Sequence, residues 1–141
     1  MSSDLNILYA EDNEADFRLM QEAFEDLGLT HQLHNAVDGE QALAFLRRTD
    51  GYSDRAPVDL LVLDLNLPRK SGLEVLVELA ADPSGNPPKI LVLTTAAREQ
   101  DVRKAAGGLD VRVVTKALDY EDFLETVRLI DTIGRGGSAR R

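Results

Sequence analysis

Cysteine is absent from this chain of 141 residues. A disulfide, a thiolate zinc site and a thiol nucleophile are therefore excluded. No apolar run approaches the roughly 20 residues that a membrane-spanning helix needs, so we expect no membrane segment. The first residues, Met-Ser-Ser-Asp, also lack the basic and apolar regions of a signal peptide, and the expected location is the cytoplasm.

Basic residues are also scarce relative to acidic ones. Sixteen Lys and Arg stand against 25 Asp and Glu, which gives a formal net charge of −9. Nucleic-acid binding is disfavoured because phosphate contacts need clustered Lys and Arg. The chain is 43% hydrophobic and 29% charged, as in soluble globular proteins, and its length suits one domain with one core.

The apolar pattern alternates between strand and helix five times. Strands are predicted at Leu5–Ala10, Gln32–Ala36, Leu60–Asp64, Ile90–Thr94 and Val111–Thr115. Amphipathic helices are predicted at Asn13–Leu27, Gly39–Arg47, Gly72–Ala81, Glu99–Ala106 and Tyr120–Ile130. Suitable helix-capping residues are Asn13, Asp38, Ser71 and Asp119 at the starts and Gly28 after the first helix.

Five such units predict an α/β fold, a doubly wound parallel sheet with helices on both faces. The polar, alternating strand at Gln32–Ala36 suits an edge, which favours the flavodoxin-like (βα)5 strand order 2-1-3-4-5. The binding crevice is then expected outside the carboxyl ends of the first and third strands. We expect one domain over residues 1–131 and a disordered tail over residues 132–141.

Polar residues follow four of these strands. They are Glu11 and Asp12, Asp64, Thr94, and Lys116. Because parallel strands end at one edge of a sheet, these side chains are expected to converge. Two carboxylates about 5 Å apart repel by roughly 3 kcal/mol at an effective dielectric constant of about 20. Such a cluster either raises a carboxyl pKa or holds a cation.

The carboxylates suit a magnesium site, since Mg²⁺ takes oxygen ligands. Asp12 and Asp64 are predicted as direct ligands and Glu11 as a ligand through water. The backbone carbonyl of Asn66 is a candidate for one more oxygen.

The same edge suits phosphoryl transfer to a carboxylate. Asp64 is the predicted nucleophile, because carboxylates form acyl phosphates. The Lys116 ammonium and the Thr94 hydroxyl are placed to stabilise the transferring group. His31 and His34 lie at the second strand, away from this edge, and are interpreted as structural or surface residues.

These motifs resemble the receiver domain of two-component response regulators over about residues 5–130. The resemblance rests on the acidic pair after the first strand, Asp64 within Leu-Asp-Leu-Asn-Leu-Pro, Gly72, Thr94 after Leu-Val-Leu, and Lys116 after Val-Val-Thr. The segments at residues 44–52 and 65–72 are similar to stand-alone receivers paired with bacterial phytochrome-type histidine kinases.

The resemblance implies phosphotransfer from a kinase phosphohistidine to Asp64, followed by self-catalysed hydrolysis. Output is expected through protein–protein interaction, since the chain ends soon after its last predicted helix. It also implies a homodimer through the face formed by the fourth helix, the fifth strand and the fifth helix. The charged residues of that face are Arg98, Glu99, Asp101, Arg103, Lys104 and Arg112.

Two residues depart from the family pattern. Val113 stands where an aromatic switch residue is usual, and Ala117 replaces the Pro that usually follows the Lys, often after a cis bond. A cis bond before a residue other than Pro costs about 2.5–4 kcal/mol, so the Lys116–Ala117 bond is expected to be trans. These departures favour one alternative, a receiver-like scaffold or dimerisation module that works without phosphorylation. The intact set of Asp12, Asp64, Thr94 and Lys116 argues against it.

Two other functions are disfavoured by single positions. A nucleotide- or flavin-binding module needs a phosphate-binding loop after the first strand, and Glu11-Asp12 would repel phosphate there. An aspartyl-phosphate hydrolase commonly carries a second Asp two residues after the nucleophile, and this chain has Asn66 at that position.

Overall fold

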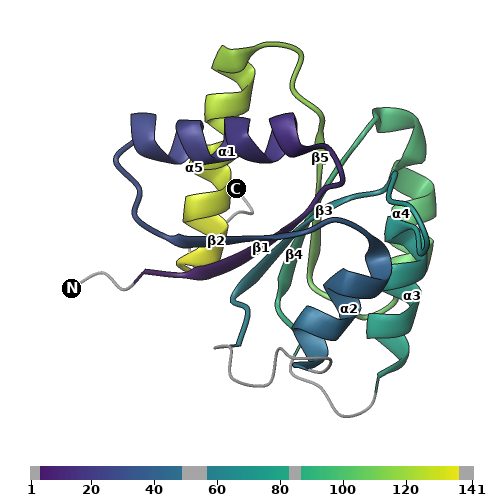
Figure 1. Cartoon of the computed structure of the whole chain (residues 1–141). Coiled ribbons are helices and arrows are strands. Elements are labelled where there is room, and N and C mark those ends of the chain that lie inside the picture. Colours follow the sequence, from purple (N-terminus) through teal and green to yellow (C-terminus); the bar gives the residue numbers. More distant parts are fainter. Residues whose placement is uncertain (1–3, 49–56, 83–86, 137–141) are drawn as a thin grey trace.

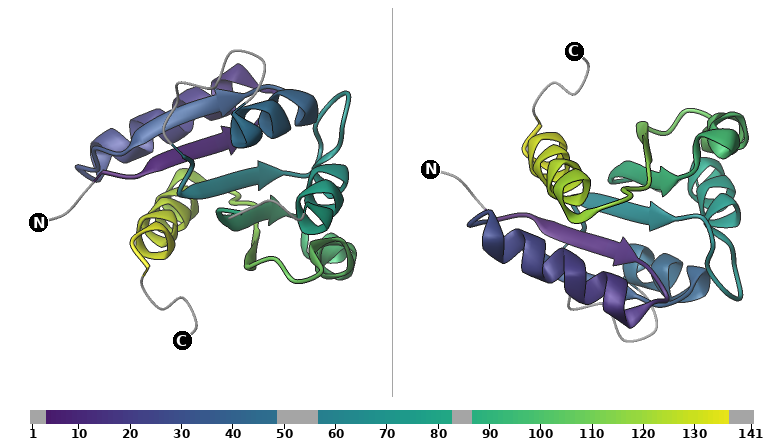
Figure 2. Two further views of the ribbon diagram at one scale, coloured as in Figure 1. Left: turned by 90° about the horizontal axis from the view of Figure 1, so that it is seen from below. Right: turned by 90° about the horizontal axis from the view of Figure 1, so that it is seen from above.

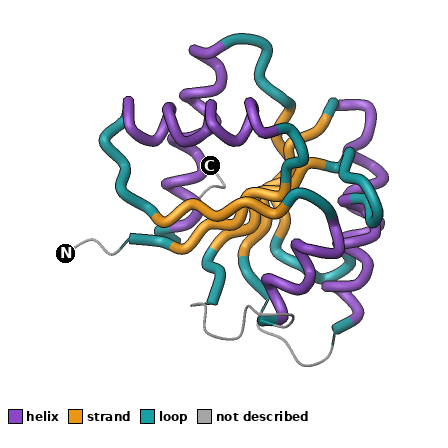
Figure 3. Tube along the Cα trace, viewed as in Figure 1, coloured by secondary structure: helices purple, strands orange, loops and turns teal. Residues whose placement is uncertain are grey.

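A computed structural model describes residues 4–48, 57–82 and 87–136 of the chain. Five parallel strands form one sheet in the order β2-β1-β3-β4-β5. The strands are β1 (Asn6–Ala10), β2 (Gln32–Ala36), β3 (Leu60–Asp64), β4 (Lys89–Thr94) and β5 (Val111–Thr115). The predicted order and the flavodoxin-like fold class are confirmed, with the polar β2 at one edge (Figure 3).

Helices cover both faces of this sheet. They are α1 (Glu14–Asp26), α2 (Gly39–Arg47), α3 (Gly72–Ala81), α4 (Glu99–Ala106) and α5 (Tyr120–Gly134), with a short 3₁₀ helix η1 (Ala96–Arg98) before α4. α1 and α5 pack together on one face, and α2, α3 and α4 pack on the other (Figures 1 and 2). None of the helices within the described ranges combines the length and the apolar character needed to cross a bilayer.

The capping predictions are confirmed. The side chain of each predicted N-cap accepts a backbone N–H of the first helical turn, at Asn13, Asp38, Ser71 and Asp119. Gly28 follows Leu27, the C-cap residue of α1. Its φ of +72° is a left-handed conformation that suits glycine. The start of every long helix except α4 is therefore fixed by a local hydrogen bond.

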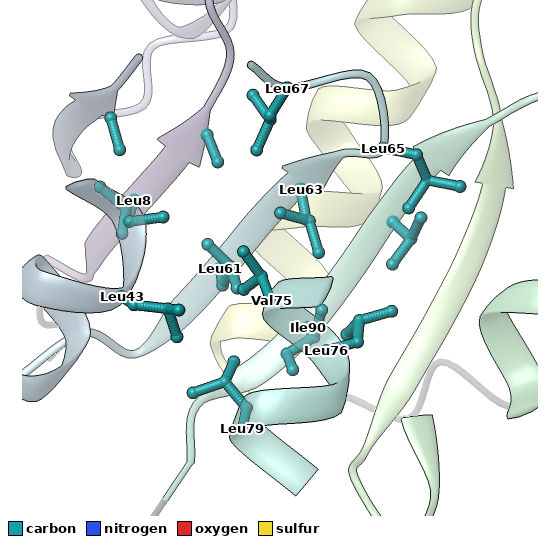
Figure 4. Close-up of a cluster of buried hydrophobic side chains, with 14 of the residues drawn as sticks. Leu8, Leu43, Leu61, Leu63, Leu65, Leu67, Val75, Leu76, Leu79 and Ile90 are labelled. Carbon is teal, nitrogen blue, oxygen red and sulfur yellow. The ribbon is translucent and has the colours of Figure 1, made fainter. Parts of the chain in front are cut away.

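Two apolar layers hold the sheet between the helices. On one side, Leu8, Leu61, Leu63 and Ile90 pack against Val75 and other residues of α2, α3 and α4 (Figure 4). On the other side, residues of β1, β3 and β4 pack against α1 and α5. Because β1, β3 and β4 are buried on both faces, their carboxyl ends form a rigid frame for the residues that follow them.

The predicted end of the last helix is wrong. α5 continues past Ile130 to Gly134, so residues 132–134 belong to the domain and not to the predicted tail. Gly134 serves close packing and not helix termination: it lies against Leu5, the residue before β1, and a Cβ there would lie 2.4 Å from Leu5 Cδ1. Residues 137–141 of the predicted tail lie outside the described residues.

A buried histidine joins the end of α5 to the start of the sheet. His31 Nδ1 accepts a hydrogen bond from the Leu5 N–H (3.0 Å), so Nε2 carries the proton that it donates to Asp131 Oδ1 (2.7 Å). Arg135 also binds Asp131 through its Nε at 2.7 Å. Burial favours the neutral carboxyl, but the bonds from His31 and Arg135 outweigh it and lower the pKa of Asp131. Of the two interpretations given for His31, structural or surface residue, its burial and hydrogen bonds support the structural one.

Replacement of His31 by Ala is expected to lower the free energy of unfolding by about 3 kcal/mol, because it leaves a cavity and removes the partner of the Leu5 amide. Urea denaturation measures the change. The exposed neighbour Thr30, whose hydroxyl donates to Asp4, is a control: Thr30→Ala should change stability by less than about 0.5 kcal/mol. Equal unfolding curves for the two variants would contradict the structural role of His31.

Candidate functional site

Four strand ends bring the predicted site residues to one edge of the sheet. Glu11 follows β1, Asp64 ends β3, Thr94 ends β4 and Lys116 follows β5. The Lys116 N–H donates to the Thr94 carbonyl oxygen (2.9 Å), which holds the start of the β5–α5 loop against β4. The Lys116 Nζ lies 2.9 Å from Asp64 Oδ2. The ammonium from β5 and the carboxylate from β3 therefore form an ion pair across β4.

Asp64 is held in place by its own loop. Its side chain is 5% exposed, and its Oδ1 accepts the Asn66 N–H at 3.0 Å. The loop then turns back beneath the aspartate, where a Cβ on Gly72 would lie 2.7 Å from the Asp64 carbonyl oxygen. Only glycine fits this close approach without moving the backbone. The β3–α3 loop thus fixes both the direction and the depth of the carboxylate.

Glu11 is buried beside Asp64 and has two hydrogen-bond donors. The Tyr9 hydroxyl donates to Glu11 Oε1 (3.3 Å), and the Asn13 N–H donates to Oε2 (3.0 Å). Burial, together with a hydrogen bond between the Glu11 and Asp64 carboxyl groups, raises the pKa of Glu11 to about 7. Burial also raises the pKa of the Tyr9 phenol, with Glu11 adding to the effect. Burial lowers the pKa of Lys116, but its bond to Asp64 outweighs this and raises it.

The donor chemistry of this edge fits a hard divalent cation. Two carboxyl groups meet in a buried position, where burial and then the hydrogen bond with Asp64 raise the pKa of Glu11, and a bound cation would favour the ionised form of both. Asp12, in contrast, is exposed, and within residues 4–48, 57–82 and 87–136 no group of three or more His, Cys, Asp or Glu side chains is arranged to hold a metal ion. The roles assigned to Asp12 and to the Asn66 carbonyl stay predictions.

The raised pKa of Glu11 predicts a pH dependence of stability without metal. The folded protein keeps the proton up to about pH 7, whereas the unfolded chain loses it near the ordinary value of 4.5. Stability should therefore fall as the pH rises from about 4.5 to about 7, by on the order of 2 kcal/mol. Glu11→Gln removes this titration. Urea denaturation at pH 5 and pH 8 in the presence of a chelator compares the two proteins, and an equal pH response in both would contradict the burial of this carboxyl.

Sequence reasoning missed the groups that orient the two carboxylates. Tyr9 counted only as an apolar residue of the first strand, yet it is the donor to Glu11. One signal was available, since residues two apart on a strand share a face, and Tyr9 precedes Glu11 by two. The backbone amides of Asn13 and Asn66 carry no sequence signal for this role. The sequence predicted a role only for the Asn66 carbonyl, as a magnesium ligand, whereas the Asn66 N–H donates a hydrogen bond to Asp64.

The structure describes both residues that depart from the family pattern, Val113 and Ala117. Val113 is half-buried and packs against the apolar layer on the α2–α4 side of the sheet. No peptide bond in the described ranges is cis, so the predicted trans bond between Lys116 and Ala117 is confirmed. Lys116 reaches Asp64 with this trans bond in place.

The sequence pattern of the response regulator receiver domain matches residues 7–128. This chain belongs to the receiver domain family. The response regulator Rcp1 of Synechocystis is 38% identical to it over 127 residues, which cover 89% of this chain and 86% of Rcp1. Receivers of similar structure include the phosphorylated cyanobacterial phytochrome response regulator RcpA, with a TM-score of 0.80 and 31% identity over 93% of this chain and 94% of RcpA. The Mn²⁺-bound form of Rcp1 superposes with a TM-score of 0.78 and 34% identity over 96% and 97% of the two chains.

Proposed function

We propose that this receiver is a single-domain response regulator that accepts a phosphoryl group on Asp64 from the phosphohistidine of a sensor histidine kinase. The observation that carries the proposal is the buried Asp64 carboxylate, paired with Lys116 at 2.9 Å and fixed by the Asn66 amide. The resemblance to phytochrome response regulators favours a bacterial phytochrome-type kinase as the donor.

In the proposed transfer, an oxygen of Asp64 bonds to phosphorus while the phosphorus–nitrogen bond of the phosphohistidine breaks. The electron pair of that bond returns to the imidazole. Water later cleaves the acyl phosphate, which releases inorganic phosphate and restores Asp64. No general base is needed, because an ionised carboxylate is already a nucleophile.

Positive charge around Asp64 assists this transfer. The Lys116 ammonium lies at the acceptor oxygen before transfer and is within reach of the phosphoryl oxygens after it. Thr94 stands at the end of β4, between the strands that carry these two residues, and its hydroxyl is the expected donor to the phosphoryl group. Glu11, Asp12, Asp64 and the Asn66 carbonyl are the residues that would hold Mg²⁺. When bound, Mg²⁺ supplies further positive charge to the transferring group.

Output is proposed through protein contacts, including a homodimer through α4, β5 and α5. Arg98, at the end of η1, pairs with Asp101 of α4 (3.1 Å), and Arg103 pairs with Glu99 within α4 (3.2 Å). Exposed pairs of this kind contribute little to stability, so they are available to rearrange toward a second copy. Light scattering with and without phosphorylation tests the oligomeric state.

A scaffold that works without phosphorylation is the second candidate function, and Val113 and Ala117 are the residues that favour it. One phosphotransfer experiment distinguishes the two functions. A bacterial phytochrome-type histidine kinase is autophosphorylated with labelled ATP, separated from nucleotide and mixed with the receiver and Mg²⁺. We expect label to pass to the wild-type receiver and not to Asp64→Asn. Equal labelling of both proteins would refute Asp64 as the acceptor.

A further inference from the structure

The buried Tyr9 side chain donates a hydrogen bond to the Glu11 carboxylate. Tyr9 is 3% exposed, and its ring packs against Phe17 with 6.3 Å between the ring centroids. This burial places the Tyr9 hydroxyl 3.3 Å from Glu11 Oε1. Since the Asn13 N–H donates to the other oxygen, the plane of the Glu11 carboxylate is set by one donor on each side.

A cavity beside Glu11 offers an alternative position for its carboxylate. The cavity has a volume of about 120 Å³ and lies between α1, the start of α5 and the loop after β5. Its lining includes Tyr9, Glu11, Asp16, Lys116 and Thr126. The lining mixes polar and apolar side chains, and Glu11 stands at its wall, so the Glu11 carboxylate can turn into the cavity. The Tyr9 hydroxyl, which belongs to the same lining, opposes that turn because it donates a hydrogen bond to Oε1.

We propose that Tyr9 is a positioning residue of this receiver: its phenol keeps Glu11 beside Asp64 for the binding of a divalent cation. The inference rests on the proposed Mg²⁺-dependent function of the same edge. It assigns Tyr9 no contact with the cation or with the phosphoryl group. Partners that orient a ligand carboxylate typically change metal affinity by about 10- to 100-fold when they are removed.

Tyr9→Phe separates the hydroxyl from the ring, because it keeps the packing against Phe17 and deletes only the donor. Tyr120→Phe is the matched control. The Tyr120 hydroxyl also donates to a carboxylate, Asp26 Oδ2 at 2.5 Å, but this bond joins α5 to the end of α1, far along the helix from Glu11. Glu11→Gln serves as the variant in which the carboxylate itself is lost.

Mn²⁺ binding, measured by electron paramagnetic resonance of the free ion, is the primary test on the full chain. We expect the dissociation constant to rise about tenfold in Tyr9→Phe and to stay unchanged in Tyr120→Phe. Phosphorylation by acetyl phosphate gives a second readout. The Mg²⁺ concentration for half-maximal rate should rise by the same factor in Tyr9→Phe, while the rate at saturating Mg²⁺ should match the wild type. If Tyr9 had only a structural role, its replacement would not raise the half-maximal Mg²⁺ concentration while leaving the rate at saturating Mg²⁺ unchanged.

A measurement on the unmodified chain accompanies the variants. With tyrosine labelled at its ζ-carbon by ¹³C, the Tyr9 resonance should shift as Mg²⁺ binds and the Tyr120 resonance should not. Wild-type affinity in Tyr9→Phe, or a Tyr9 resonance unmoved at saturating Mg²⁺, would overturn the inference and leave the proposed function intact. If the wild type bound no Mn²⁺, and Glu11→Gln behaved identically, the cation site itself would be refuted, and the inference with it.

Discussion

Asp64→Asn is expected to abolish phosphorylation and the stabilisation by Mg²⁺ while leaving the metal-free domain at least as stable as the wild type. The Asn side chain still offers an oxygen to the Asn66 amide, which binds Asp64 Oδ1 in the wild type. Above about pH 7, where Glu11 is ionised, it also relieves the repulsion between the two carboxylates, which is roughly 3 kcal/mol at a separation of about 5 Å. The lost ion pair with Lys116 costs little, because the Lys116 side chain is 41% exposed.

Calorimetry with and without millimolar Mg²⁺ measures both effects on stability, since a ligand of the native state raises its melting temperature. Asp59→Asn is a matched control at the opposite end of β3, where Asp59 accepts the Asn6 N–H at 2.8 Å. It should keep both the Mg²⁺ shift and phosphorylation. A lower melting temperature of metal-free Asp64→Asn at pH 8, where Glu11 is ionised, would contradict the crowding of the two carboxylates. A full Mg²⁺ shift in that variant would contradict the cation site.

Gly39→Ala is expected to lower the free energy of unfolding by about 3 kcal/mol or more, through a clash with backbone that neither partner can easily avoid. A Cβ on Gly39 would lie 1.9 Å from the Lys70 carbonyl oxygen and 2.7 Å from its carbonyl carbon. Either α2 or the β3–α3 loop must then move. Because the same loop supplies the Asn66 amide to Asp64, the variant should also phosphorylate more slowly at temperatures where it is folded.

Urea denaturation measures this loss against Gly108→Ala. A Cβ on Gly108 meets nothing within 4 Å, and its backbone is not left-handed. The same chemical change there should alter stability by less than about 1 kcal/mol. A Gly39→Ala variant as stable as Gly108→Ala would show that the β3–α3 loop yields easily, and the rigid placement of Asp64 would then be wrong.

The parts of the fold that local chemistry determines could be predicted from the sequence. The N-caps at Asn13, Asp38, Ser71 and Asp119 each bond to a backbone amide within three residues, so their identity and spacing suffice. The polarity of β2 predicted its edge position because a buried strand could not carry Gln32 and His34. Parallel strand direction then predicted that Asp64 and Lys116 lie at one edge.

The parts that depend on contacts distant in sequence could not be predicted. His31 and Asp131 are 100 residues apart, and neither carries a sign of the other. The end of α5 depends on how Gly134 packs against Leu5, whereas propensity alone favours a helix end before a glycine. The burial of the acidic pair was also not predictable from its sequence, since Glu11 is buried and the adjacent Asp12 is exposed.

Trapping of the phosphoryl group tests the central claim most directly. The receiver is incubated with acetyl phosphate and Mg²⁺ and treated with borohydride, which reduces an aspartyl phosphate to homoserine, and peptide mass spectrometry then locates the homoserine. We predict homoserine at position 64 alone and only in the presence of Mg²⁺. Homoserine at another position would contradict Asp64 as the acceptor. The claim would also be contradicted if no homoserine formed at position 64 and the wild type released phosphate from acetyl phosphate no faster than Asp64→Asn does.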